Sequence, residues 1–417
     1  MSFVMSRSIV TLVLLASMLT GRPHGEAVAQ VSTPDASHES VQTDVPMYRG
    51  NAGRTGVMPG PGPMGQPTEL WRYQIPGEVQ SQPAVVDGVL YVGGEDGGVY
   101  ALEAATGAEV WRFTADAPVS SSPAVVDGLV YIGSDDGTLY ALEAGTGVER
   151  WAFPGTRSNA SAAVSDGVVY TGSEDGFLYA LDAATGAQVW SAELGAGASR
   201  SAAVAQGIVA IGDTDGIVHA VDATNGEERW QFPTEGGGIP GTIAIAQDTV
   251  YFGTQEGETH ALYAVDVTTG QERWSFAAPS GETMRVPAIG DGVVYSASDD
   301  GAIYALDAAT GEERWHFTTG DATGISPALV GNVLYFPSSD RTLYAVDVAS
   351  GEEVWRFPID GIALQGPTVI GGVAYIGTSF GNLYAIGSSE GDGAASASPA
   401  SDWSGNDFLA NGIRSIA

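Results

Sequence analysis

The chain contains no cysteine and no lysine. The absence of cysteine excludes disulfide bridges, thiol catalysis, cysteine-ligated zinc and a cysteine-linked lipid anchor. All 16 basic residues are arginine and stand against 50 acidic residues, which gives a formal net charge of -34. Because such a charge repels nucleic acid and anionic lipid, we expect neither of them as a partner.

Long apolar runs are also scarce. The one clear run, residues 9–19, follows Arg7 and precedes the small residues Ala27-Val28-Ala29. It is too short to span a bilayer comfortably, so it predicts a signal peptide over residues 1–29, with an uncleaved anchor as the alternative. We therefore expect a mature chain that begins near Gln30 and is exported to the periplasm or the extracellular space. It should have no membrane span, and we expect a monomer.

Tryptophan recurs at a nearly constant interval. Eight tryptophans are spaced by 40, 40, 39, 40, 44, 41 and 40 residues: Trp71, Trp111, Trp151, Trp190, Trp230, Trp274, Trp315 and Trp355. Glycine is abundant as well, at 58 of 417 residues, which indicates many tight turns. A fixed period of about 40 residues is typical of a repeat architecture.

Each unit divides into four short β-rich runs. In the unit of residues 121–153 these are Pro123–Val126, Leu129–Gly133, Thr138–Glu143 and Glu149–Phe153, with glycine-containing turns between them. Four strands joined by hairpins and repeated at this interval predict a propeller blade. No unit has the 3.6-residue apolar period that a helical repeat requires.

The number of units predicts how the ring closes. Eight first strands can be counted, beginning at Pro83, Pro123, Ala162, Ala202, Ile243, Pro287, Pro327 and Pro367. The last unit ends at Gly387 without a tryptophan strand, whereas the run Leu70–Tyr73 precedes the first unit and would fill this gap. We therefore predict an all-β fold over residues 67–387. This is an eight-bladed β-propeller of four-stranded antiparallel blades, closed by the N-terminal strand pairing into the last blade. Residues 30–66 are predicted to be a flexible leader and residues 388–417 a low-complexity tail.

Residues 101–111, Ala-Leu-Glu-Ala-Ala-Thr-Gly-Ala-Glu-Val-Trp, resemble the tryptophan-docking motif of the PQQ-like propeller family. The motif recurs at residues 180–190, 264–274, 305–315 and 345–355. The resemblance implies that each tryptophan packs between blades, against the alanine of its own motif and the glycine turn of the next blade. Ala305, Gly311 and Trp315 are then structural, and the eight tryptophans are blade-docking residues.

Two groups share this family fold. The quinoprotein dehydrogenases bind pyrroloquinoline quinone and calcium inside the ring, and resemblance to them would imply long insertions that carry the metal ligands. Here the units are only about 40 residues long and offer no such insertion. The BamB-like group matches in blade number and unit length, although BamB is a lipoprotein and this chain has no cysteine to acylate.

The resemblance thus favours a non-catalytic binding or scaffolding propeller for an unknown protein, peptide or small ligand. No catalytic residue, metal or cofactor is expected. A PQQ-dependent oxidoreductase with calcium, or a degenerate relative of one, is the alternative. An extracellular sensor or surface-recognition module is a third possibility.

Positions that vary while their surroundings repeat are candidates for binding. In propellers the turn into each innermost strand lies near the central channel. Arg200 and Arg285 occupy this position in two units, and Arg157 is likewise outside the set of arginines that flank the tryptophans. These three predict a ligand site at the channel mouth for a carboxylate or another anion, with pairing to local acidic residues as the alternative.

Other polar motifs have simpler explanations. Asp213-Thr214-Asp215-Gly216 is the fragment most similar to a calcium loop, but it lacks the preceding and distal ligands. Asp-Gly pairs recur at one turn of nearly every unit, which indicates hairpin turns. His219 replaces a repeated tyrosine, for which local repacking is the expected reason.

Overall fold

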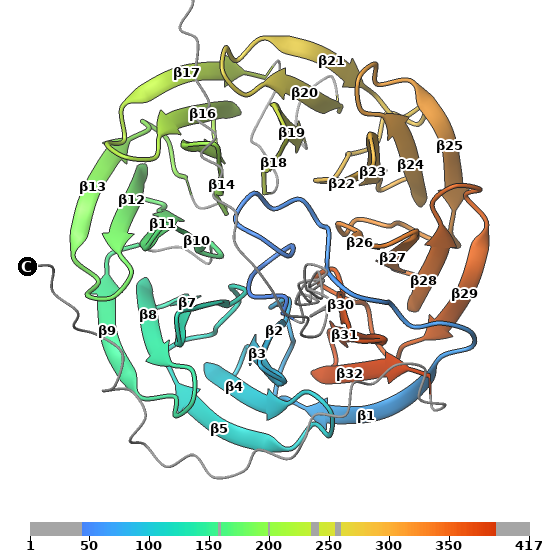
Figure 1. Ribbon diagram of the computed structural model, residues 1–417, viewed down its shortest axis with the longest axis horizontal. Helices are drawn as coiled ribbons and strands as arrows, with labels where there is room; N and C mark the ends of the chain where they lie inside the picture. Colours follow the sequence, from blue (N-terminus) through green and yellow to red (C-terminus); the bar gives the residue numbers. More distant parts are fainter. Residues whose placement is uncertain (1–43, 157–159, 199–200, 235–241, 255–259, 389–417) are drawn as a thin grey trace, which may run out of the picture. The chain divides into compact units, whose positions relative to one another are not determined.

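The computed structural model describes residues 44–156, 160–198, 201–234, 242–254 and 260–388. All regular elements in these residues are β-strands, and they form eight antiparallel four-stranded sheets arranged in a ring (Figure 1). The eight-bladed β-propeller predicted from the repeat is confirmed. No helix that could cross a membrane occurs in the described residues.

Each blade contributes one short strand to the wall of the central channel. These innermost strands are β2 (Ala84–Val86), β6 (Ala124–Val126), β10 (Ala163–Ser165), β14 (Ala203–Ala205), β18 (Ala244–Ala246), β22 (Ala288–Gly290), β26 (Ala328–Val330) and β30 (Thr368–Ile370). The second strands are β3 (Val89–Gly93), β7 (Leu129–Ser134), β11 (Val168–Gly172), β15 (Ile208–Gly212), β19 (Thr249–Gly253), β23 (Val293–Ala297), β27 (Val333–Ser338) and β31 (Val373–Gly377).

Two longer strands complete each blade toward the rim. The third strands are β4 (Gly98–Glu103), β8 (Thr138–Glu143), β12 (Phe177–Asp182), β16 (Ile217–Asp222), β20 (Leu262–Asp266), β24 (Ala302–Asp307), β28 (Thr342–Asp347) and β32 (Asn382–Gly387). The outermost strands are β5 (Glu109–Thr114), β9 (Glu149–Pro154), β13 (Gln188–Glu193), β17 (Glu228–Pro233), β21 (Glu272–Phe276), β25 (Glu313–Thr318), β29 (Glu353–Pro358) and β1 (Thr68–Gln74).

The N-terminal strand closes the ring. We number the blades 1 to 8 in the chain order of their innermost strands, from β2 to β30. The sheet order in blade 8 is β1-β32-β31-β30, and β1 is antiparallel to β32, with Arg72 opposite Tyr384 and Tyr73 opposite Leu383. The first and last strands of the propeller therefore share one sheet, and β32 has a partner on both sides. This confirms the closure predicted from the orphan strand.

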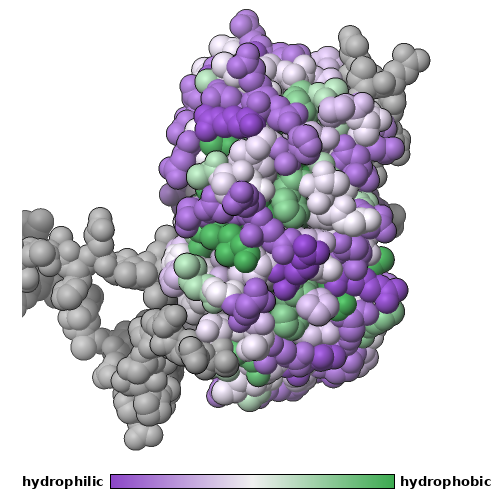
Figure 2. Space-filling view, turned by 90° about the vertical axis from the view of Figure 1, so that its right-hand side faces the viewer, coloured by the Kyte–Doolittle hydropathy of each residue, from purple (hydrophilic) through white to green (hydrophobic). Residues whose placement is uncertain are grey.

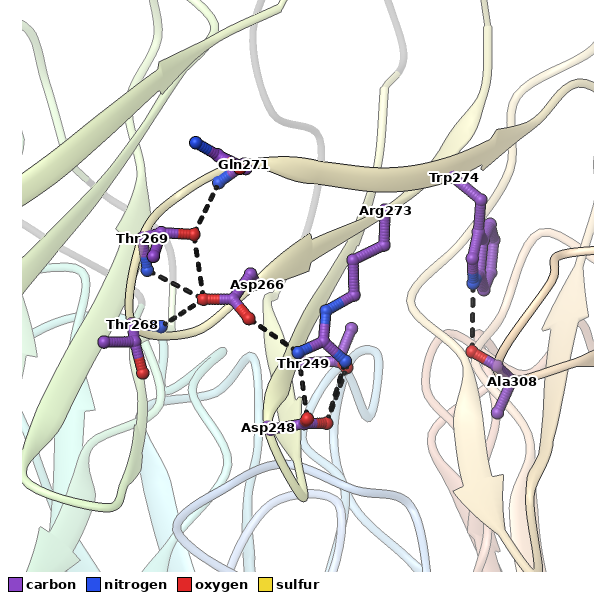
Figure 3. A network of polar contacts seen from close by, with 9 residues as sticks. All are labelled: Asp248, Thr249, Asp266, Thr268, Thr269, Gln271, Arg273, Trp274 and Ala308. Atoms are coloured by element: carbon purple, nitrogen blue, oxygen red, sulfur yellow. Dashed lines mark hydrogen bonds and ion pairs between the residues drawn. The ribbon is translucent and has the colours of Figure 1, made fainter.

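The tryptophans dock each blade onto the next. Trp111 lies opposite Ala101 in its own blade and donates a hydrogen bond of 2.7 Å from Nε1 to Ala144 O in the next blade. Its ring lies against Gly147, where a Cβ atom would come within 2.6 Å of the indole. Most of the other tryptophans repeat this arrangement, among them Trp274, whose bond to Ala308 is seen in Figure 3. The docking role implied by the family motif is thus confirmed.

Arginines beside these tryptophans hold the outer turns. The Arg273 guanidinium contacts Asp248 at 2.9 Å and Asp266 at 2.6 Å (Figure 3). Hydrogen bonds from Arg273 and Thr269 lower the pKa of Asp266.

The outer wall seen in Figure 2 is mostly hydrophilic, with apolar side chains in small, separate groups.

Residues 44–66, expected to belong to a flexible leader, pack into the propeller instead. We call them the N-terminal segment, and they run through the central channel and then outward to β1 (Figure 1). Backbone amides of the innermost strands donate to this segment: Val85 to Val45, Val125 to Pro46, Val204 to Ala52, Ile245 to Gly53, Ile289 to Thr55 and Leu329 to Gly56, at 2.7–2.9 Å. The physical reason is that innermost strands have an unpaired edge toward the channel, and the segment satisfies it.

The same segment replaces a missing docking turn. In blade 8 the third strand, β32, ends at Gly387, and the described residues include no turn after it that could receive Trp355 from blade 7. Instead, Trp355 Nε1 donates a hydrogen bond of 3.1 Å to Pro63 O. With 1 % of its surface exposed, Trp355 is the most buried tryptophan of the series within the described residues.

Buried tyrosines should make the fold sensitive to alkali. Burial raises the pKa of Tyr131, Tyr295 and Tyr375 to about 12, above the ordinary value of about 10. Because the folded state holds these protons more tightly than the unfolded state, their contribution to stability is complete below about pH 10 and is lost as the pH rises toward 12. We expect the free energy of unfolding, measured with denaturant, to fall across this interval. A constant value there would contradict the burial of these phenols.

Candidate binding site at the channel mouth

Hydroxyl side chains link the entrances of consecutive innermost strands. The backbone amide of Gln82 donates to Ser122 Oγ at 2.9 Å, that of Ser122 to Ser161 Oγ at 2.9 Å, and that of Ser161 to Ser201 Oγ at 2.8 Å. Each hydroxyl accepts a bond from the preceding blade and retains its own proton for donation. The rim of the channel is therefore held by side chains that can still donate a hydrogen bond.

The N-terminal segment forms the floor beneath this rim. Tyr48 lines the cavity at the mouth, and its hydroxyl donates to Gln365 Oε1 at 3.3 Å. The Arg54 guanidinium carbon lies 5.3 Å from the centre of the Tyr48 ring, within the range of a cation–π interaction. The channel is thus occupied below the mouth by the chain itself.

Arg54 is fully buried, and its hydrogen bonds to the described residues all go to backbone carbonyls. Its Nε donates to Ala202 O at 3.1 Å and its Nη1 to Tyr48 O at 2.9 Å. Its Nη2 donates to both Ser161 O and Ala162 O at 2.8 Å. One side chain therefore joins the N-terminal segment to the entrances of blades 3 and 4.

Arg49 has a similar position. It donates from Nε to Arg54 O at 3.0 Å and from Nη2 to Pro287 O in blade 6, while its buried Nη1 has no hydrogen-bond partner within the described part of the chain. Burial lowers the pKa of Arg49 to about 10 and that of Arg54 to about 9, so both remain protonated at neutral pH. Among the described residues neither arginine has an ion-pair partner, so two positive charges lie under the mouth.

The mouth itself is a cup of about 260 Å³ with walls from all eight blades. Its lining is mainly hydroxyl, amide and backbone groups, including those of Ser120, Ser201, Thr242 and Gln365. Arg285 is the one charged residue among the described residues that line it. Because the charge of Arg285 is paired with Asp299, the positive charges without an ion pair near the cup, within the described ranges, are those of Arg49 and Arg54 beneath it.

The structure describes the position of one of the three arginines predicted to bind a ligand. Arg285 lies on the wall of the cup and is bound to Asp299, with contacts of 2.9 Å to Oδ1 and 2.8 Å to Oδ2. The local pairing considered as the alternative is thus present, although Arg285 still faces the cavity. Arg157 and Arg200 lie outside the described residues, so their place at the mouth stays a prediction.

Sequence reasoning missed Arg49, Arg54 and Tyr48. They belong to a glycine- and proline-rich segment without a repeat, so no period marked them as part of the fold. The available signal was charge: Arg49 and Arg54 are two of only 16 basic residues, and both lie just before the first blade.

The described residues do not fit a calcium-dependent quinone site. Calcium takes six to eight oxygen ligands and usually several carboxylates. The carboxylates next to the cup are already bonded: both oxygens of Asp299 bind Arg285, Asp135 accepts from Ser120, and Glu78 accepts from Gln80. No cluster of three or more potential metal ligands occurs among the described residues. His219, expected to reflect local repacking, is buried away from the cup and contacts Asp213 at 2.9 Å.

Comparisons with known proteins agree with this architecture. The family model described as outer membrane protein assembly factor BamB matches residues 65–162, 154–283 and 258–409. The chain belongs to this family. Among curated proteins, no relative was found.

Solved structures share the fold of this BamB family member at low identity. BamB from Moraxella catarrhalis is 22% identical over 77% of this chain and 100% of its own, with a TM-score of 0.64. The computationally designed Ika8 protein is 20% identical over 77% of this chain and 99% of its own, with a TM-score of 0.68. Quinohemoprotein alcohol dehydrogenase from Comamonas testosteroni is 16% identical over 84% of this chain and 81% of its own, with a TM-score of 0.66. These likenesses span an assembly factor, a designed protein and an enzyme, so the fold alone assigns no activity.

Proposed function

We propose that this chain is an exported, non-catalytic propeller that binds a peptide or protein segment at the channel mouth. The observation that carries the proposal is the cup, whose walls come from eight blades and whose floor is the N-terminal segment. A cavity closed below receives a ligand from one side only. Membership of a family described by an assembly factor also supports a role in binding a protein.

The chemistry of the cup favours a carboxylate-bearing ligand. Arg285 and the hydroxyls of Ser161 and Ser201 line it, and the charges of Arg49 and Arg54 lie below. A peptide C-terminus or an acidic side chain could bind Arg285 in exchange for Asp299 and accept hydrogen bonds from the hydroxyls. We therefore propose a peptide carboxylate as the group that enters the cup.

The proposal can be tested with a displayed library of random peptides. Peptides selected on the wild-type protein should bind the Arg285→Gln variant about 10-fold more weakly, because a charge-assisted bond is lost. The ion pair is partly exposed, at 24% for Arg285 and 28% for Asp299, so the Tm should change by no more than about 2 °C. Arg150→Gln on an outer strand is the matched control and should leave binding unchanged. If no peptide is selected, or if Arg285→Gln binds every peptide normally, the proposal fails.

A PQQ-dependent oxidoreductase is the second candidate, favoured by the structural likeness to a quinohemoprotein alcohol dehydrogenase. We expect the purified protein, incubated with calcium and pyrroloquinoline quinone, to retain no quinone after gel filtration. Stoichiometric retention with alcohol-dependent dye reduction would establish the oxidoreductase instead.

A further inference from the structure

One face of the propeller carries a repeated acidic turn. The turns between second and third strands hydrogen-bond to the loops that line the cup, as in the bond from Asp135 N to Pro118 O, so both lie on the mouth face. In most blades this turn ends in Asp-Gly. The aspartate accepts a hydrogen bond from a tyrosine of the third strand, as Asp136 does from Tyr140 at 2.9 Å and Asp300 from Tyr304 at 2.8 Å. The glycine has a positive φ, which is 87° at Gly137.

Blade 7 departs from this pattern at Arg341. It takes the place of the glycine and has a φ of 65°, a conformation that is unfavourable for a residue with a Cβ. Its side chain is exposed, and among the described residues it has no ion-pair partner. The other exposed or half-exposed arginines in the described residues are all ion-paired: Arg72, Arg112, Arg150, Arg229, Arg273, Arg285, Arg314 and Arg356.

Blade 8 departs from it at Phe380, which takes the place of the aspartate. Tyr384 therefore has no turn carboxylate to bind, and its hydroxyl accepts a bond of 3.3 Å from Asp360 N instead. The Phe380 side chain is 59% exposed, and the Arg341 guanidinium carbon lies 6.0 Å from the centre of its ring. In blade 7 an exposed positive charge thus stands in place of the turn glycine, and in blade 8 an exposed aromatic ring stands in place of the turn aspartate.

An apolar groove adjoins both turns, because it is lined by Ser339 of the Arg341 turn and by Ile362, whose amide donates to Ser379 Oγ next to Phe380. It has a volume of about 520 Å³. Its apolar lining includes Ile325, Pro337, Ile362 and Leu364, and the Arg285–Asp299 ion pair also lines it. Ile325 and Leu364 also line the cup, so the groove and the cup are continuous. Among the described residues, Ile362 and Phe380 are the large exposed apolar side chains of the mouth-face loops, whereas the others lie on outer strands, outer turns or the N-terminal segment.

We propose that Arg341, Phe380 and this groove, together the blade 7–8 sector, bind an extended peptide segment of a partner protein. The segment carries an aromatic or branched aliphatic side chain for the groove and a carboxylate for Arg341. This inference rests on the proposed function and locates its binding surface. Arg341 and Phe380 make their turns less stable, and both side chains are exposed. Residues that cost stability in this way are expected at binding surfaces, where they serve function. The unpaired arginine in an acidic protein specifies the charge of the partner group.

The test uses variants that remove the sector without weakening the fold. Arg341→Gly restores the turn residue of the other blades, so the Tm should rise by about 2 °C. Phe380→Ser removes an exposed ring, so the Tm should stay within about 2 °C. Peptides selected on the wild-type protein from the random library should bind each variant about 10-fold more weakly. Val189→Ser, an exposed apolar residue on the outer strand of blade 3, is the control and should bind normally.

The outcomes separate this inference from the proposed function. Peptides that lose affinity for Arg285→Gln but bind Arg341→Gly and Phe380→Ser normally would overturn the sector and leave the cup as the binding site. Selection of no peptide would overturn both. A concentration-dependent dimer in sedimentation, present in the wild type and absent in Phe380→Ser, would show that a second copy of the chain occupies the sector, and would also overturn the proposal of a peptide.

Discussion

Replacing Arg54 by methionine should lower the Tm by about 5 °C. Four hydrogen bonds from its guanidinium reach backbone carbonyls of the N-terminal segment and of blades 3 and 4. Methionine fills the volume but leaves those buried carbonyls without donors, at a cost of about 3 kcal/mol or more. Thermal unfolding followed by circular dichroism measures the effect.

Arg150→Met is the matched control for this substitution. Arg150 is an exposed arginine with one ion pair to Glu143, so its replacement should change the Tm by no more than about 2 °C. Equal Tm values for the two variants would show that the N-terminal segment adds nothing to the stability of the ring. They would also contradict its description as the floor of the cup.

Removal of residues 67–75 should abolish cooperative folding or lower the Tm by more than about 10 °C. The deletion removes β1, exposes the edge of β32 and takes away Trp71, which donates a hydrogen bond of 2.9 Å to Ala104 O in blade 1. Removal of residues 390–417, a tail of low complexity, is the comparison and should have little effect. Equal melting temperatures for the two truncations would refute the closure.

A crosslink tests the same closure without removing any strand. Tyr73 and Leu383 face each other across β1 and β32, and the chain has no cysteine of its own. Cysteines placed at these two positions should form a disulfide on mild oxidation and raise the Tm relative to the reduced form. Failure of the pair to oxidise would indicate that the two strands do not adjoin.

The ring could be predicted because its residues repeat. The tryptophans and the Asp-Gly turns recur once per unit, so counting them gives the number of blades. The run Leu70–Tyr73 supplies the one strand that the last unit lacks, which predicts the closure. The N-terminal segment could not be predicted in this way. Its backbone accepts hydrogen bonds from six similar innermost strands at six different residues, so its sequence has no period, and its glycines and prolines resemble those of a linker.

The candidate site was predictable only in part, for the same reason. Arg285 was found because it interrupts a repeated position, but its bond to Asp299 depends on the spatial approach of a loop and a turn in one blade. Arg341 and Phe380 also interrupt a repeat, at the Asp-Gly turns, and this signal is visible in the sequence. What the sequence could not show is that the two lie side by side, with a ring-to-guanidinium distance of 6.0 Å.

Hydrogen exchange of the full-length protein, with and without the tightest selected peptide, tests the central claim that this propeller binds a partner at its channel mouth. We expect slower exchange in the loops that line the cup and in the mouth-face turns of blades 7 and 8, around residues 322–326, 339–342, 360–366 and 378–381. The outer strands β5, β9 and β13 should exchange as they do in the free protein. Protection confined to the outer strands, with none at the mouth, would contradict the account.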